Sequence, residues 1–419
     1  MLPLPSQRNP YLQVTSHHSG SVKPRILMAG AALGDPSGNA VSSEVLLSAL
    51  GQIGNVTRLS HRAAPLPSWH AREENVIELG TQPFVIHGEA IAAGFVQRRR
   101  LSAWICGWAV NSRYAGALMM SGLPYAIWEA TLTADELHST TIAESRMNGR
   151  GTGLGVALHS MLLPIGEGLE GLLYRKAAVL CAMSEYTRSR MIDKHGLRPD
   201  RVLLLPHPPS TVFLSALKRV GPGAAKIRTS KREGLALLFV GRVDDPRKGV
   251  AELLEAVAHA RSAKMPVNLT LVGPFSAKWK SRFSPLVAAA GARLLGRVDV
   301  EELARHYLSH DALVLPSRQE GFGIVVSEAF HAGLPVIATR CGGPEATIRA
   351  SGGGLLTERS AEAMAATFQT LLANNALRDQ LSTGASRYAL AELSPAAFTH
   401  RVCELTKQLV EITAMRQTG

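Results

Sequence analysis

The sequence has few aromatic residues, few charges for its length and only four cysteines. Aromatic residues make up 5% of the 419 residues and charged residues 19%, whereas 46% are hydrophobic. This composition is typical of a folded globular protein, and it excludes a disordered chain and a nucleic-acid module that stacks bases on aromatic rings. A chain of this length is expected to form two domains, each of which buries its own core.

The cysteines lie far apart, with no C-x-x-C pair and no spacing typical of zinc ligands. We expect Cys106, Cys181, Cys341 and Cys403 to be small buried side chains in a reducing compartment. Arg, Gly or Pro interrupts each hydrophobic run before it reaches the length of a membrane-spanning helix. Residues 1–24 lack the apolar core of a signal peptide, and we expect a leader on a cytoplasmic protein.

The net charge of +12 is spread along the chain. Residues 1–210 carry 19 basic and 15 acidic side chains, and residues 211–419 carry 26 and 18. Two basic clusters stand out. One, at residues 218–232, falls in a stretch rich in Gly and Ala that is expected to be a solvated linker. The other, three arginines at residues 98–100, is expected to end an exposed helix, with peripheral contact with anionic membrane at the inner membrane face left open as an alternative.

The first half begins with the pattern of a Rossmann-like unit. Residues 25–30 form a short apolar strand, a loop with Gly34 and Gly38 follows, and residues 42–50 are expected to be helical. Further apolar runs alternate with helical stretches, which predicts a parallel α/β domain over residues 25–208. The expected strands after the first are at residues 84–86, 103–106, 125–128, 178–181 and 202–205.

The same alternation restarts at residue 235 and predicts a second Rossmann-like domain over residues 233–395. Its expected strands are at residues 235–240, 268–272, 293–295, 313–315 and 336–338. Residues 209–232 are predicted to link the two domains. Residues 396–419 have apolar side chains at helical spacing, which predicts an amphipathic C-terminal helix.

Residues 316–328 are the most informative stretch. An apolar strand ends at Pro316, a loop with Gly321 and Gly323 follows, and an apolar helical stripe begins. Glu320 is therefore expected on the loop after the strand, and Glu328 about one turn into the helix. Glycines allow close approach of the backbone to a ligand, and a helix start offers unpaired amides to an anion. Two acids beside such a helix suit a ligand with phosphate and hydroxyl groups, such as a nucleotide-sugar.

The stretch from Glu320 to Glu328 resembles the E-x7-E signature of glycosyltransferase family 4, whose members are retaining enzymes with the GT-B fold. Three further blocks in family order, at residues 239–249, 294–298 and 335–345, resemble its phosphate-binding Arg/Lys segment, its base-binding loop and its Gly-Gly turn. The resemblance covers most of residues 233–350. It implies two facing Rossmann-like domains with a deep interdomain cleft, and a C-terminal helix that crosses back onto the first, acceptor-binding domain.

The resemblance also implies the roles of residues in the second, donor-binding domain. Arg242 and Lys248 would neutralise the leaving diphosphate, so that no metal or other cofactor is required. Asp245 and Arg247 beside them are expected to point to solvent. Glu320 would bind hydroxyls of the donor sugar, as positioning and electrostatic support rather than as a nucleophile.

The remaining donor contacts follow from the same motifs. Glu328 would accept hydrogen bonds from the ribose hydroxyls. Backbone groups at Arg297 and Val298 would contact the base. The amides of residues 321–324 (Gly321, Phe322, Gly323 and Ile324) would hold sugar hydroxyls or phosphate.

The first domain departs from the family pattern. Its first loop contains Gly38 but lacks the Gly-Gly pair of many relatives, and the strand at residues 125–128 is not followed by the usual histidine. Glu129 and Thr131 are the candidates to touch the reacting sugar or acceptor. Trp128 is expected in the core, and the stretch from Ser184 to Thr187 is explained by helix capping.

The sequence therefore predicts a retaining hexosyltransferase of glycan biosynthesis that uses a UDP- or GDP-sugar and binds no nucleic acid. Two alternatives remain: a sugar-nucleotide epimerase, which shares the fold, and a non-catalytic sugar-nucleotide-binding partner. The acceptor is left open between a lipid-linked glycan, a polysaccharide and a small molecule, because variable loops of the first domain would select it. The sugar, the base, the linkage and the oligomeric state are also left open.

Overall fold

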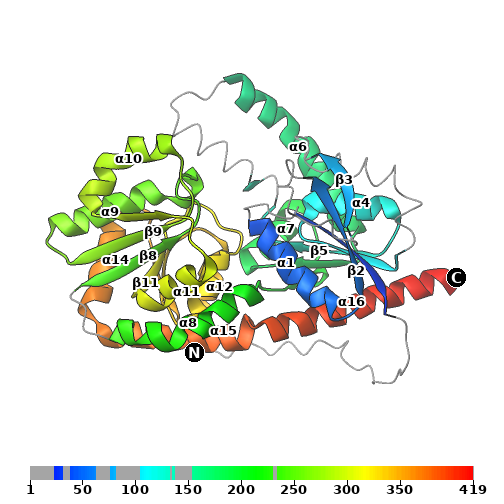
Figure 1. Cartoon of the computed structure of the whole chain (residues 1–419). Coiled ribbons are helices and arrows are strands. Elements are labelled where there is room, and N and C mark those ends of the chain that lie inside the picture. Colours follow the sequence, from blue (N-terminus) through cyan, green and yellow to red (C-terminus); the bar gives the residue numbers. More distant parts are fainter. Residues whose placement is uncertain are drawn as a thin grey trace.

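Two parallel β-sheets, each with helices packed on it, form the protein (Figure 1). The computed structural model describes residues 23–31, 38–62, 76–81, 104–132, 135–136, 153–229 and 234–418. The first sheet has the strand order β3-β2-β1-β4-β5-β6-β7 and the second β10-β9-β8-β11-β12-β13. In each sheet the order reverses beside the first strand, and ligands of such folds bind at the carboxyl ends of the strands near that reversal.

The strands of the first sheet are short, and the four central ones, at residues 25–30, 106–109, 125–129 and 179–182, are mostly apolar, as expected for strands buried on both faces. The strands of this sheet are β1 Arg25–Gly30, β2 Asn55–Arg62, β3 Val76–Thr81, β4 Cys106–Ala109, β5 Tyr125–Glu129, β6 Val179–Ala182 and β7 Val202–Leu204. The helices of this half are α1 Gly38–Gly51, α4 Ser112–Ser121, α6 Gly153–Lys176 and α7 Glu185–His195.

The second half alternates strand and helix more regularly. Its strands are β8 Leu235–Val240, β9 Val267–Val272, β10 Arg293–Gly296, β11 Ala312–Leu315, β12 Val336–Thr339 and β13 Gly354–Thr357. Its helices are α9 Val250–Ser262, α10 Ala277–Ala290, α11 Val300–Ser309, α12 Ile324–His331, α13 Gly343–Ser351, α14 Ala361–Ala373 and α15 Asn375–Glu392.

Most predicted strands are present. Those at residues 25–30 and 235–240 have the predicted bounds, whereas the one expected at 103–106 lies at Cys106–Ala109. Strands β2, β3 and β13 were not predicted, because polar residues or glycine interrupt their apolar pattern. The strand expected at 84–86, the basic cluster at 98–100 and the loop with Gly34 lie outside the described residues.

Residues 209–232 were predicted to be a solvated linker, and this is wrong. Most of the stretch forms helix α8, Thr211–Thr229. Phe213 and Ala216 of this helix are buried, and the Phe213 ring meets Tyr307 of α11 edge-on with the ring centroids 5.3 Å apart. Arg219 forms an ion pair with Glu301. Apolar residues three and four positions apart give the stretch an amphipathic face, which its high Gly and Ala content obscured.

The last helix, α16 Pro395–Thr418, reaches from the second domain across the first (Figure 1). Thr406 accepts a hydrogen bond of 3.0 Å from the indole Nε1 of Trp108 in β4, and the Thr413 hydroxyl donates to the carbonyl of Ile105 at 2.7 Å. Val402 and Leu409 are wholly buried. The helix therefore ties the two domains together by packing and by hydrogen bonds.

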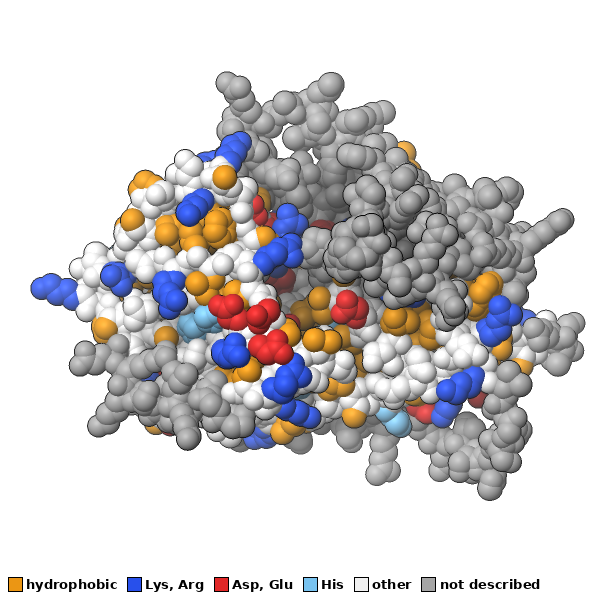
Figure 2. All heavy atoms as spheres, viewed as in Figure 1, with side chains coloured by type: hydrophobic (Ala, Val, Ile, Leu, Met, Phe, Trp, Pro, Cys, Tyr) orange, Lys and Arg blue, Asp and Glu red, His pale blue; other side chains and the backbone are white. Residues whose placement is uncertain are grey.

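One cluster of buried apolar side chains runs continuously from the first sheet to α11, α12 and α15 of the second domain. A second cluster fills the opposite face of the second sheet, under α9 and α14. None of the helices in the described part of the chain is long and apolar enough to span a membrane. On the face shown in Figure 2, Lys and Arg side chains are scattered, in keeping with the even spread of charge along the sequence.

Replacing Thr406 by Val tests the attachment of α16. The change leaves the indole N–H of Trp108 buried without a partner, so the free energy of unfolding should fall by about 1–3 kcal/mol in urea titrations. Thr370→Val is the matched control, because the Thr370 hydroxyl also bonds the carbonyl four residues earlier but lies exposed on α14. Equal losses in both variants would show that the contact with Trp108 contributes nothing.

Candidate functional site

Three loops at the carboxyl ends of β8, β11 and β12 are hydrogen-bonded to one another. The amide of Arg318 donates to the carbonyl of Arg247 at 2.8 Å, which joins the first loop to the second. The amide of Glu320 donates to the carbonyl of Cys341 at 2.7 Å, and the amide of Gly343 returns a bond of 2.8 Å to the Glu320 carbonyl. The backbone of Glu320 is therefore fixed on both sides.

The side chains of Lys248 and Glu320 form an ion pair within this cluster. The Lys248 Nζ lies 2.6 Å from Oε1 of Glu320, and the same oxygen accepts a bond of 2.7 Å from the Ser317 hydroxyl. The two side chains are 26% and 11% exposed, so the pair is partly reachable from solvent. The structure thus brings together two residues that the sequence placed in one site although they lie 72 positions apart.

Glycines allow the loops to pack this closely. Gly249 has φ = 64°, and a Cβ added there would lie 2.1 Å from the carbonyl oxygen of Pro316. Gly323, the N-cap residue directly before α12, has φ = 80°. Both positions require a residue without a side chain. The first turns of α9 and α12 therefore begin beside the ion pair, where their free amides favour an anion.

Glu328 lies in the second turn of α12, as predicted. Its Oε2 accepts a hydrogen bond of 2.6 Å from the hydroxyl of Tyr307 in α11. Burial raises the pKa of Glu328 to about 7, and the bond from Tyr307 offsets only part of that rise. Tyr307 was not predicted as a site residue. It lies on a different helix from Glu328, so no local sequence pattern links the two residues.

The other predicted donor contacts follow strands β8, β10 and β11 at the same edge of the second sheet. Arg242 is exposed one residue after Gly241, at the end of β8, and Arg297 is exposed after β10, with Val298 half-buried beside it. Phe322 is 5% exposed. Ile324 is the first residue of α12.

Asp245 and Arg247 do not point to solvent, which corrects the prediction for both. Arg247 forms an ion pair with Asp245 at 2.8 Å and another with Glu136 of the first domain at 3.1 Å. The Asp245 side chain also caps the turn by accepting from the Arg247 amide at 2.9 Å. The two residues therefore brace the loop and connect it to the opposite domain.

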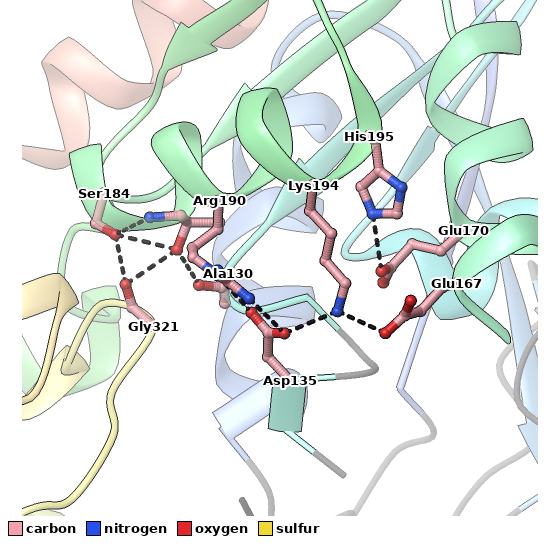
Figure 3. Close-up of polar contacts among 10 residues, drawn as sticks. Ala130, Asp135, Glu167, Glu170, Ser184, Arg190, Lys194, His195 and Gly321 are labelled. Carbon is pink, nitrogen blue, oxygen red and sulfur yellow. Dashed lines mark hydrogen bonds and ion pairs between the residues drawn. The ribbon is translucent and has the colours of Figure 1, made fainter. Parts of the chain in front are cut away.

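The start of α7 in the first domain lies directly against the loop after β11 (Figure 3). The Ser184 hydroxyl donates to the carbonyl of Gly321 at 2.5 Å, and the Thr187 hydroxyl donates to the carbonyl of Ala130 at 2.6 Å. A Cβ added at Gly321 would lie 1.9 Å from Oγ1 of Thr131. Gly321 was expected to admit a ligand, whereas its open side is filled by the first domain.

Glu129 is not accessible from the protein surface, which corrects its assignment as a catalytic candidate. It is wholly buried, and its Oε2 accepts from the Ser112 amide at 2.8 Å and from the Tyr174 hydroxyl at 2.9 Å. Burial raises its pKa to about 8, and the charge of the neighbouring Glu170 adds to the rise. With no exposed surface, its carboxyl group supports the first domain rather than a reacting sugar.

The remaining first-domain predictions are placed as follows. Gly38 begins α1, and Thr131 is half-buried against Gly321. Trp128 is fully buried and stacks on His207 at 5.0 Å, which confirms its core role. Cys106, Cys181 and Cys341 are also buried, as expected, whereas Cys403 is only half-buried, which corrects the expectation for that residue. A separate hollow of about 420 Å³ lies at the other ends of β8 and β9, lined by Arg293, His306 and His310, away from all these groups.

Residues 234–374 match the family model described as Glycosyl transferases group 1. The chain therefore carries a glycosyl transferases group 1 domain. This confirms the resemblance drawn from the four sequence blocks. The match includes Arg242, Lys248 and both glutamates of the E-x7-E motif.

Curated relatives support the same assignment. The D-inositol 3-phosphate glycosyltransferase of Geodermatophilus obscurus is 35% identical over 216 residues, which cover 48% of this chain and 46% of the relative. The phosphatidyl-myo-inositol mannosyltransferase of Mycobacterium tuberculosis is 34% identical over 181 residues, covering 43% and 45%. The chain thus spans about half the length of the curated relatives it matches.

Solved structures confirm the GT-B fold over nearly the whole chain. Sucrose-phosphate synthase from Thermosynechococcus elongatus superposes with a TM-score of 0.69 at 18% identity, over 93% of this chain and all of its own. Anabaena HepE in complex with UDP gives 0.66 at 16% identity, over 92% of this chain and all of its own. At such identities the likeness concerns the fold alone.

Glu129→Gln tests the buried carboxyl group through the pH dependence of stability. Because the pKa of Glu129 is raised from 4.5 to about 8 on folding, the unfolded chain ionises first, and stability should fall as pH rises between those values. The amide cannot ionise, so the thermal midpoint of the variant should fall less from pH 5 to pH 8. Exposed Glu411→Gln is the control. Parallel curves for Glu129→Gln and the natural protein would contradict the assignment.

Proposed function

We propose that the protein is a retaining glycosyltransferase that transfers a hexose-type sugar from a UDP- or GDP-sugar to a hydroxyl group of an acceptor. The ion pair of Lys248 and Glu320 is the observation that supports this most directly. It combines a cation for a leaving phosphate with a carboxylate for sugar hydroxyls, beside the starts of two helices. The family match of residues 234–374 and the similarity to glycosyltransferases support the same reaction.

In this proposal the second domain holds the donor. Lys248 and Arg242 balance the charge that develops on the diphosphate as the glycosidic bond breaks, with the amides at the start of α12 adding to them. No metal ion is then needed for transfer. Glu320 positions the sugar ring and stabilises the positive charge of an oxocarbenium-like transition state, and Glu328 accepts the ribose hydroxyls.

The acceptor is proposed only by class. The names of the relatives indicate inositol phosphates or phosphatidylinositol as acceptors for those proteins. Since the matches to these two relatives cover less than half of this chain, a lipid-linked glycan, a polysaccharide and a small molecule all remain candidates here. Cytoplasmic location and contact with an anionic membrane surface remain predictions, the latter resting on residues 98–100, which lie outside the described residues.

Acceptor-dependent release of nucleoside diphosphate tests the proposed reaction. The protein is incubated with UDP- and GDP-hexoses and a panel of hydroxyl acceptors, with and without a chelator, and products are examined by NMR. We expect release only with acceptor, retained anomeric configuration, and equal rates with the chelator present. An epimerised donor without transfer would favour the epimerase, and donor binding without reaction would favour the non-catalytic partner. Activity that requires added magnesium or manganese would contradict the metal-independent mechanism.

Lys248→Ala and Arg242→Ala test the leaving-group role. Removing one preorganised charge from a developing anion costs a factor of about a hundred or more in turnover, so each variant should lose at least that in kcat. Lys280→Ala, which removes an exposed lysine of α10, should behave like the natural protein. Near-normal turnover in Lys248→Ala or Arg242→Ala would remove the role assigned to that residue.

The two glutamates should affect different steps. Glu328→Ala should weaken binding of free nucleoside diphosphate and intact donor alike, because both carry the ribose, whereas Glu320→Gln should slow transfer and leave diphosphate affinity largely intact. Calorimetric titration measures both. Tyr307→Phe is the control for Glu328→Ala, since it removes the hydroxyl partner and keeps the carboxylate. The reverse pattern, with diphosphate binding lost only in Glu320→Gln, would refute this placement of the motif.

A further inference from the structure

The start of helix α7 contacts a backbone segment of each domain through two hydroxyl groups, those of Ser184 and Thr187. Both side chains are buried, at 5% and 1% exposure. Ser184 lies after β6 at the N-cap of α7, and its Oγ accepts from the Thr187 amide at 3.1 Å. Capping alone would satisfy that amide. This capping bond uses only the oxygen of Ser184, so the hydroxyl protons of Ser184 and Thr187 are both available to donate elsewhere.

The distances assign the two protons. Ser184 Oγ is 2.5 Å from the Gly321 carbonyl oxygen and 3.1 Å from Oγ1 of Thr187, so its proton goes to Gly321. Thr187 Oγ1 is 2.6 Å from the Ala130 carbonyl oxygen and 3.2 Å from that of Gly321, so its proton goes to Ala130. Ser184 therefore bonds across the domain boundary to Gly321 (Figure 3). Thr187 bonds the loop after β5 in its own domain.

The Gly321 carbonyl belongs to the peptide group between Gly321 and Phe322, directly after Glu320 in the turn. The preceding carbonyl, that of Glu320 itself, is already held by the amide of Gly343 within the second domain. The bond from Ser184 is thus a second restraint on the same turn, and it exists only while the first domain is in place. It restrains the backbone on the C-terminal side of Glu320, the residue whose carboxylate pairs with Lys248.

Further contacts show that the two domains are built to meet at this turn. A Cβ at Gly321 would lie 2.0 Å from the Ala130 carbonyl oxygen, and one at Gly342 would lie 3.0 Å from the ring of Tyr186 in α7. Arg247 reaches Glu136 from the adjoining loop. Because Gly321 and Gly342 lack side chains, the first domain packs directly against the backbone of the second domain at this turn.

We propose that Ser184 is a positioning residue for sugar transfer, whose hydroxyl holds the Glu320–Gly321 turn in its working geometry only when the two domains are docked. This rests on the proposed function. The proposal gives the first domain, which lacks the usual histidine, a part in the reaction: its Ser184 restrains the backbone turn that carries Glu320. Diphosphate binding relies mainly on Lys248, Arg242 and the start of α12, all in the second domain, and we expect it to persist without this contact, whereas transfer requires it.

Two substitutions separate positioning from helix capping. Ser184→Gly and Ser184→Ala both lack the hydroxyl, but glycine is a far better N-cap than alanine, so the first variant should fold with little loss of stability. If positioning is the role, both variants should lose about tenfold in kcat, the equivalent of one hydrogen bond of about 1.4 kcal/mol, with affinity for UDP or GDP within twofold of normal. Ser360→Ala removes the equivalent N-cap from α14, away from the boundary, and should leave kcat unchanged.

Hydrogen exchange of the peptide spanning residues 320–323 gives a readout that needs no catalysis. It should accelerate in Ser184→Gly and remain normal in Ser360→Ala. Normal kcat in Ser184→Gly, or a loss of kcat that follows helix stability and appears only in Ser184→Ala, would overturn the proposal. If exchange accelerates in Ser184→Gly but the natural protein transfers no sugar, the restraint of the turn by Ser184 is supported and the glycosyltransferase function is refuted.

Discussion

The contact between the two domains at Glu320 and Gly321 is the constraint on which the site depends. Parallel sheets present their loops at the carboxyl ends of the strands, and here the two sheets bring those ends together. The turn that carries Glu320 is consequently bonded to the loop after β12 on one side and to the start of α7 on the other. The role proposed for Glu320 requires a carboxylate held within about half an ångström, and these two backbone bonds each restrain the turn that carries it.

Buried carboxyl groups occur on both sides of this contact, but they have different environments. Glu129 is wholly enclosed by the first domain, beside Glu170, whereas Glu328 lies half-buried in α12 with Tyr307 as its partner. Desolvation raises the pKa of each. A raised pKa therefore marks a functional carboxyl group only when the side chain can also reach a ligand.

The sequence predicted the second domain well because its signals are local. A strand, a glycine turn and a helix start fixed the places of Glu320 and Glu328, and the Arg/Lys segment followed its strand as expected. The first domain was less predictable. Glu129 was chosen from its position after a strand, but which way its side chain points depends on Ser112 and Tyr174, which come from other elements. The contacts of Ser184 and Arg247 cross the domain boundary and leave no trace in the local pattern, and α8 was missed because glycine and alanine outweighed its apolar stripe.

The most direct test of the account is a crystal structure of the protein with bound UDP or GDP. We predict that the diphosphate lies within hydrogen-bonding distance of Lys248 and the first turn of α12, with the ribose hydroxyls against Glu328. The hollow lined by Arg293, His306 and His310 at the opposite ends of the strands serves as an internal comparison. Nucleotide bound there, with the loops around Glu320 empty, would contradict the central claim.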